Sequence, residues 1–127
     1  MVNTGRYCVF EKIDENIGIK RYVSKKIAKI AYSRQLSAFK VNAAPKPLEW
    51  VDEKSFKTEI ADVEKMYNSL LPKIDYGFMF PDLIKALTPI LGNNELGKKS
   101  SNRINNIDLA RHNIGIYNKR VVMVDFT

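Results

Sequence analysis

The chain has 127 residues, of which 45% are hydrophobic and 28% are charged, and its formal net charge is +7 at pH 7. This length is typical of one domain and too short for two full ones. No apolar run approaches the roughly 20 residues of a membrane helix, and the first residues lack the apolar stretch of a secretory signal, so we expect a cytoplasmic protein without a membrane segment.

The amino-terminal segments alternate between strand and helix patterns. Residues 6–13 and 17–23 are rich in β-branched and aromatic side chains around a polar turn, which predicts a hairpin. Ser24 is a suitable N-cap for a following helix, which should end before Pro45 because the residue before a proline avoids helical angles. An apolar stripe should turn this helix toward the core: Ala28, Tyr32, Leu36 and Phe39.

Two further short strands are predicted at 48–51 and 55–60, followed by helices. The first helix carries the apolar residues Val63, Met66, Tyr67, Leu70 and Leu71 and should end at Pro72. A second should begin near Pro81, be interrupted at Pro89 and close at Gly92.

The polar stretch 92–106 is typical of a mobile surface loop. A last hairpin follows, with arms at 113–117 and 121–126 and its bend at Asn118-Lys119. This order predicts an α+β protein: a small antiparallel amino-terminal sheet with one helix, then a reduced helical part and a carboxy-terminal β-hairpin.

Basic residues cluster between Asn16 and Leu48, a stretch without any acidic residue. Such a run is most often a solvated helix face. The alternatives are a site for nucleotide or nucleic-acid phosphate and a surface for an acidic protein partner. The lone Cys8 cannot form an internal disulfide, and we expect it to be packed rather than reactive.

The carboxy-terminal hairpin should bring three oxygen-bearing side chains together. The ends of its two arms lie side by side, which places Asn113 next to Asp125, with Asp108 just upstream. Carboxylate and carboxamide oxygens suit Mg²⁺, which is commonly bound by protein oxygens and phosphate oxygens together. The alternative is that these residues only stabilise turns, because Asp and Asn favour loops and strand ends, where their side chains bond to nearby backbone.

These residues resemble the protein-kinase-like superfamily, in which Asp-Leu-x-x-x-Asn is followed by a short hairpin and Asp-Phe-Gly. Here Asp108-Leu109-Ala110-Arg111-His112-Asn113 reproduces the spacing, and Asp125-Phe126-Thr127 occupies the metal-binding position. The resemblance implies that Asp108 is the catalytic residue, that Asn113 and Asp125 bind Mg²⁺, and that ATP is the nucleotide.

The amino-terminal half resembles the same superfamily in the expected order. Gly5 stands in a segment that resembles the glycine-rich loop but retains only one glycine. Ile17-Gly18-Ile19-Lys20 resembles the strand whose lysine binds nucleotide phosphates. Ala43 to Leu48 resembles the helix-to-strand link of compact atypical kinases of the RIO, lipopolysaccharide-kinase and aminoglycoside-phosphotransferase type. Glu59 would end the strand that leads to the adenine-binding hinge. The resemblance spans nearly the whole of 1–127 as one kinase-like domain, with 1–60 as the amino-terminal lobe and 61–127 as a reduced carboxy-terminal lobe.

The sequence also departs from the family pattern. The helix after Lys20 has no glutamate to pair with it, and Gln35 is the nearest polar substitute. Asn106 and Ile107 replace the usual His-Arg, and Thr127 replaces the last glycine of Asp-Phe-Gly. The chain stops where an activation segment would begin, so we expect a kinase-like fold truncated after this position.

Three functions follow from these patterns. The first is a kinase-like protein that binds ATP with Mg²⁺ and transfers a phosphoryl group. The second is a catalytically silent kinase-like module that binds and modulates a host protein, as a virus-encoded factor would. The third is nucleic-acid binding through the basic segment 20–46. Neither the oligomeric state nor the phosphoryl acceptor follows from the sequence.

Overall fold

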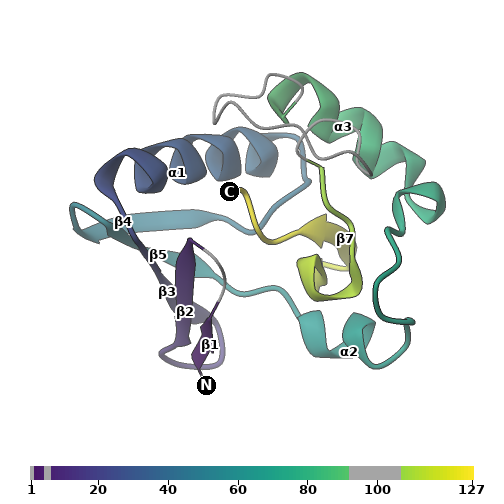
Figure 1. Ribbon diagram of the computed structural model, residues 1–127, viewed down its shortest axis with the longest axis horizontal. Coiled ribbons are helices and arrows are strands. Elements are labelled where there is room, and N and C mark those ends of the chain that lie inside the picture. The colour runs from purple at the N-terminus through teal and green to yellow at the C-terminus, as the bar shows by residue number, and fades with distance from the viewer. Residues whose placement is uncertain (1, 5–6, 92–106) are drawn as a thin grey trace.

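A computed structural model describes residues 2–4, 7–91 and 107–127 of the chain, with side chains from residue 7 onward; Gly5 and the predicted loop 92–106 lie outside these residues. Five antiparallel strands form the main sheet, in the spatial order β1 (Val2–Thr4), β2 (Cys8–Lys12), β3 (Ile17–Tyr22), β5 (Ser55–Glu59) and β4 (Pro47–Asp52). Helix α1 (Lys25–Lys40) lies beside this sheet, and the shorter helices and the last hairpin lie toward the other end of the molecule (Figure 1). The predicted α+β architecture is confirmed.

The predicted first hairpin is present as β2 (Cys8–Lys12) and β3 (Ile17–Tyr22). Its turn is built on Asp14, whose carboxylate accepts hydrogen bonds from the backbone N–H groups of Asn16 and Ile17 at 2.8 and 2.9 Å. The sequence did not predict β1 (Val2–Thr4), which pairs with β2 at the sheet edge. Three residues are too few to show a period-2 pattern.

Helix α1 (Lys25–Lys40) begins as predicted, because the Ser24 hydroxyl accepts a hydrogen bond from the backbone N–H of Ile27 at 3.2 Å. The predicted apolar stripe is only partly right, since Tyr32, Leu36 and Phe39 are half-buried. The fully buried line is made of small and polar residues: Ala28, Ala31, Arg34, Gln35 and Ala38. Small side chains let the helix approach the sheet closely.

Strands β4 (Pro47–Asp52) and β5 (Ser55–Glu59) confirm the second pair of predicted strands. Helix α2 (Val63–Tyr67) is shorter than predicted, because it ends at the C-cap Asn68 rather than at Pro72. A 3₁₀ turn, η1 (Gly77–Met79), then leads into α3 (Pro81–Leu91), which begins at the predicted proline and contains Pro89.

A 3₁₀ turn, η2 (Arg111–Asn113), precedes the last hairpin, which consists of β6 (Ile114–Tyr117) and β7 (Arg120–Met123). Asn118 and Lys119 both have positive φ angles, 50° and 65°, as a two-residue hairpin bend requires. The second arm was predicted to run to Phe126 but ends at Met123. The chain beyond it leaves the hairpin and returns toward the main sheet.

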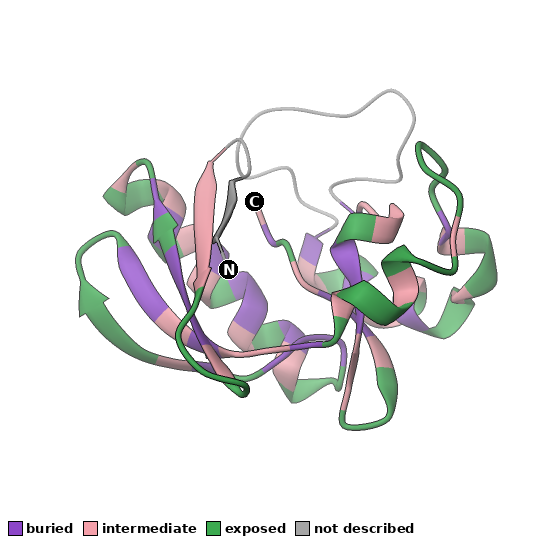
Figure 2. Cartoon of the chain, turned by 90° about the horizontal axis from the view of Figure 1, so that it is seen from below, coloured by how far each residue is buried: buried purple, intermediate pink, exposed green. Residues whose placement is uncertain are grey.

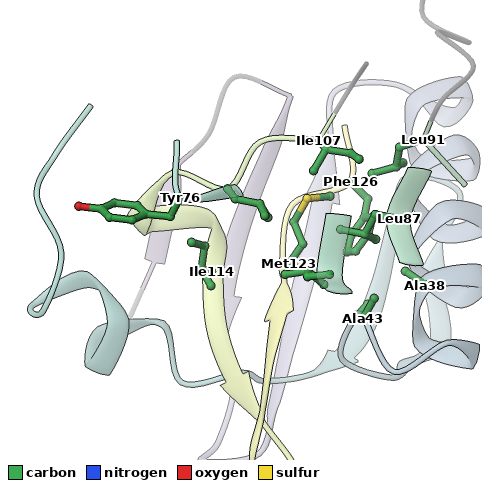
Figure 3. Packing of buried hydrophobic residues seen from close by; sticks show 12 residues of the cluster. Ala38, Ala43, Tyr76, Leu87, Leu91, Ile107, Ile114, Met123 and Phe126 are labelled. Carbon is green, nitrogen blue, oxygen red and sulfur yellow. The ribbon is translucent and has the colours of Figure 1, made fainter. Parts of the chain in front are cut away.

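The buried hydrophobic residues form two clusters. The smaller lies between the sheet and α1 and contains Tyr22, Ala28, Ala31 and Phe56. The larger joins the end of α1 to α3, the hairpin and the tail, with Leu87, Met123 and Phe126 at its centre (Figure 3). Figure 2 shows where the buried positions fall along these elements. Among the described helices, none has the length and apolar character to span a membrane.

Candidate functional site

Lys20 lies on β3 in the middle of the sheet, and only 8% of its surface is exposed. Its ammonium group donates to the side-chain Oε1 of Gln35 at 2.8 Å and to the backbone oxygen of Val124 at 2.6 Å. Burial lowers the pKa of Lys20, and electrostatic interactions with Cys8 and Asp125 oppose this shift. A buried cation is therefore held between the sheet, α1 and the carboxy-terminal tail.

Gln35 is the centre of a buried polar network. While its oxygen accepts from Lys20, its amide nitrogen donates to Thr58 Oγ1 at 2.7 Å and to the backbone oxygen of Pro45 at 3.0 Å. The side chain thus connects β3, β5 and the link after α1. Sequence reasoning identified Gln35 as the residue nearest in character to the missing glutamate, but it did not identify Thr58.

The hairpin ends bring Asn113 and Asp125 into one neighbourhood along the backbone. Ile114 pairs with Met123, and one step further the backbone oxygen of Asn113 accepts from the N–H of Val124 at 3.0 Å. Asn113 is buried, whereas Asp125 is exposed. The Asp125 carboxylate accepts hydrogen bonds from the backbone N–H and the hydroxyl of Thr127 at 3.1 and 2.8 Å.

Asp108 lies between two core residues, Ile107 and Leu109, which anchor its backbone. Its carboxylate accepts a hydrogen bond from the backbone N–H of Ala110 at 3.1 Å. The oxygen of Ala110 in turn accepts from the N–H of Asn113 at 2.9 Å. A single turn therefore connects Asp108 to the residue predicted to bind metal.

Glu59 ends β5, as predicted, and faces the last hairpin. Its carboxylate accepts a hydrogen bond from the hydroxyl of Tyr117 on β6. Burial, followed by the hydrogen bond to Glu59, raises the pKa of Tyr117 to about 12. No local pattern predicts this contact, because the two residues are 58 positions apart along the chain.

Arg34 is a second buried cation that sequence reasoning missed. Only 3% of its surface is exposed, and its Nη1 donates to the backbone oxygen of Phe126 at 3.3 Å. Cys8 lies on the same part of the sheet as Lys20. Burial raises the pKa of its thiol, which agrees with the expectation of a packed cysteine.

The oxygen donors fit a hard cation only in part. Asn113 and Asp125 offer the amide and carboxylate oxygens that Mg²⁺ prefers. Within residues 2–4, 7–91 and 107–127, no group of three His, Cys, Asp or Glu side chains converges as a metal site would require.

The predicted basic segment loses two of its charges to the interior, because Lys20 and Arg34 are buried. Lys25, Lys26, Lys29, Lys40 and Lys46 remain exposed. The Lys25 ammonium lies 3.9 Å from the carboxylate of Glu53, at the edge of an open groove that Trp50 also lines. This groove lies between the start of α1 and the turn from β4 to β5.

Comparisons with known proteins found no matching family model, no matching curated protein and no matching solved structure.

Proposed function

We propose that this chain binds ATP with Mg²⁺ in the manner of a kinase-like protein and transfers its γ-phosphoryl group. The observation that carries the proposal is the position of the Lys20 ammonium between Gln35 and the backbone of Val124, one residue before the exposed carboxylate of Asp125. A cation beside a metal-binding carboxylate is the pair that a triphosphate needs.

Each residue has a distinct role in this proposal. An ammonium group has three N–H donors, and Gln35 and Val124 accept two of them, so Lys20 can offer the third to a phosphate oxygen. Asp125 and Asn113 would hold Mg²⁺, which when bound neutralises charge on the phosphates. Glu59 would lie at the strand end leading to adenine.

Asp108 would orient the acceptor hydroxyl and take its proton. The acceptor oxygen forms a bond to the γ-phosphorus while the bond from that phosphorus to the β,γ-bridging oxygen breaks, so that ADP leaves with the electron pair. The backbone N–H of Ala110 holds the Asp108 carboxylate in place for this role. Lys20 would stabilise the negative charge on the phosphates as the transfer proceeds.

Calorimetric titration with ATP and Mg²⁺ tests the proposal. We expect wild type to bind, Lys20→Met to bind at least tenfold more weakly, and Asp125→Asn to lose the magnesium-dependent part of the affinity. Lys12→Met, an exposed lysine on the neighbouring strand, is the matched control and should bind as wild type does. Absence of any binding by wild type at millimolar nucleotide would overturn the proposal.

A second candidate is the silent module that acts by binding a protein. This candidate is favoured because both buried cations donate hydrogen bonds to the backbone of the protein itself: Lys20 donates to Val124, and Arg34 donates to Phe126. In that case Lys20→Met would lower the thermal stability of the protein, and wild type would show no heat of nucleotide binding.

A further inference from the structure

An exposed apolar surface lies at the end of the molecule opposite the main sheet. Half of the ten large hydrophobic residues that the described chain exposes fall within thirteen consecutive residues, from the end of α2 to η1. We call these five side chains the apolar surface: Tyr67, Leu71, Ile74, Phe78 and Met79. Phe78 is 75% exposed and Leu71 is 66% exposed. Figure 1 shows α2 and the chain that follows it away from the sheet and α1.

This surface is held in shape by its own contacts. The Tyr76 hydroxyl accepts a hydrogen bond from the backbone N–H of Leu71 at 2.7 Å and donates to the oxygen of the same residue at 3.2 Å. The Tyr76 ring lies 5.9 Å from the ring of Phe78. Leu71 and Phe78 are thus both in contact with one buried tyrosine.

A second set of contacts fixes the start of the segment. The guanidinium of Arg111 lies 3.9 Å from the ring centre of Tyr67 and donates to the backbone oxygen of Leu70 at 3.1 Å. A preorganised apolar surface costs less conformational entropy to bind than a flexible one. Exposed apolar surfaces of several hundred Å² mark interaction sites in soluble proteins.

The local charge indicates which partner this surface accepts. Residues 62–85 contain four carboxylates, Asp62, Glu64, Asp75 and Asp82, and three lysines, Lys65, Lys73 and Lys85, so their net charge is −1. The whole chain carries +7, so the remainder carries +8. Two copies that meet through this end place their strongly basic parts far from each other.

The area is also of the right order for a second copy. A fully exposed large side chain offers roughly 200 Å² of surface. With the exposed fractions of these five residues, the exposed area of the apolar surface is roughly 500 Å² on each copy. A specific interface buries about 800 Å² on each partner, and the polar rim of a contact supplies the difference. We therefore propose that the apolar surface forms an isologous homodimer interface, with Phe78 and Leu71 at its centre.

Sedimentation velocity over a concentration series from micromolar to near-millimolar tests this inference. We expect wild type to pass from monomer to dimer, and Phe78→Ser and Leu71→Ser each to weaken the dimer at least tenfold. Raised salt should strengthen the wild-type dimer, because it screens the repulsion between the basic ends. The control is Val51→Ser, at an exposed apolar position on β4, which should dimerise as wild type does.

Two results would overturn the inference. One is a wild type that stays monomeric over the whole series, which would leave the surface to a different protein. The other is a dimer that Phe78→Ser and Leu71→Ser leave intact, which would place the interface elsewhere. Both positions are exposed, so the variants should fold, and their circular dichroism spectra can verify this. The sedimentation experiment contains no nucleotide, so its result does not depend on whether the chain binds ATP.

Discussion

The contact between Tyr117 and Glu59 connects the end of the main sheet to the last hairpin through a single hydrogen bond. Burial is the main reason that the pKa of Tyr117 rises to about 12, and the carboxylate of Glu59 adds to it, because a negative charge nearby disfavours a phenolate. A residue with such a pKa makes stability depend on pH in the alkaline range.

We predict that wild type loses more stability than Tyr117→Phe as the pH rises from 10 to about 12. The unfolded chain releases the Tyr117 proton near pH 10, while the folded chain keeps it until about pH 12, so the unfolded state binds fewer protons in this window and the free energy of unfolding falls. Urea unfolding of both proteins across the window measures this difference. If the two curves stay parallel, the hydroxyl of Tyr117 is not held as described.

At the scale of elements, the molecule depends on close contact between β6 and the segment that follows β5. Asp62 and Ile116 exchange two backbone hydrogen bonds, at 2.8 and 3.0 Å. Gly115 makes this approach possible, because a Cβ atom there would lie 2.8 Å from the Cβ of Ala61 and 3.2 Å from a methyl group of Val63. Neither neighbour is a long side chain that can turn away.

Gly115→Ala should therefore lower the free energy of unfolding by about 1–3 kcal/mol, the usual cost of overpacking. Gly18→Ala is the comparison variant, since its Cβ would meet the far end of the half-buried Phe10 side chain, which can rotate. We expect a smaller loss there. Chemical denaturation measures both, and equal losses would mean that the approach of β6 to Ala61 is not tight.

At the scale of the whole molecule, the carboxy-terminal tail, residues 124–127, connects the elements that surround the two hydrophobic clusters. The Phe126 side chain is 1% exposed within the larger cluster, and the backbone oxygens of Val124 and Phe126 accept hydrogen bonds from Lys20 on β3 and Arg34 on α1. Residues more than ninety positions apart are thereby connected. The same tail carries the exposed Asp125, which directly follows Val124.

Phe126→Ala should cost about 3–5 kcal/mol of stability, because it removes a fully buried aromatic ring and leaves a cavity. Phe78→Ala is the matched control and should change stability by less than about 0.5 kcal/mol, because that ring is 75% exposed. Guanidinium unfolding of the three proteins at low, equal concentration gives the comparison. A small loss for Phe126→Ala would show that the tail contributes little to the fold.

The sequence by itself determined the order and kind of most elements. Local signals sufficed for this: the period-2 segments of β2 and β3, the Ser24 cap of α1, Pro81 at the start of α3, and the Asn118-Lys119 bend. It also placed Asn113 and Asp125 at neighbouring ends of one hairpin, since register follows from a short turn.

Only the tertiary structure decided which face of α1 is buried, that β7 ends at Met123, and that Lys20, Gln35 and Thr58 form one polar network. The reason is physical: residue patterns report local conformation, whereas these features depend on contacts between distant segments. Lys20 meets Val124 across 104 positions of sequence, and no local periodicity encodes such a pair. Arg34 and Gln35 of α1 are buried because the tail and β5 provide hydrogen-bond partners for them.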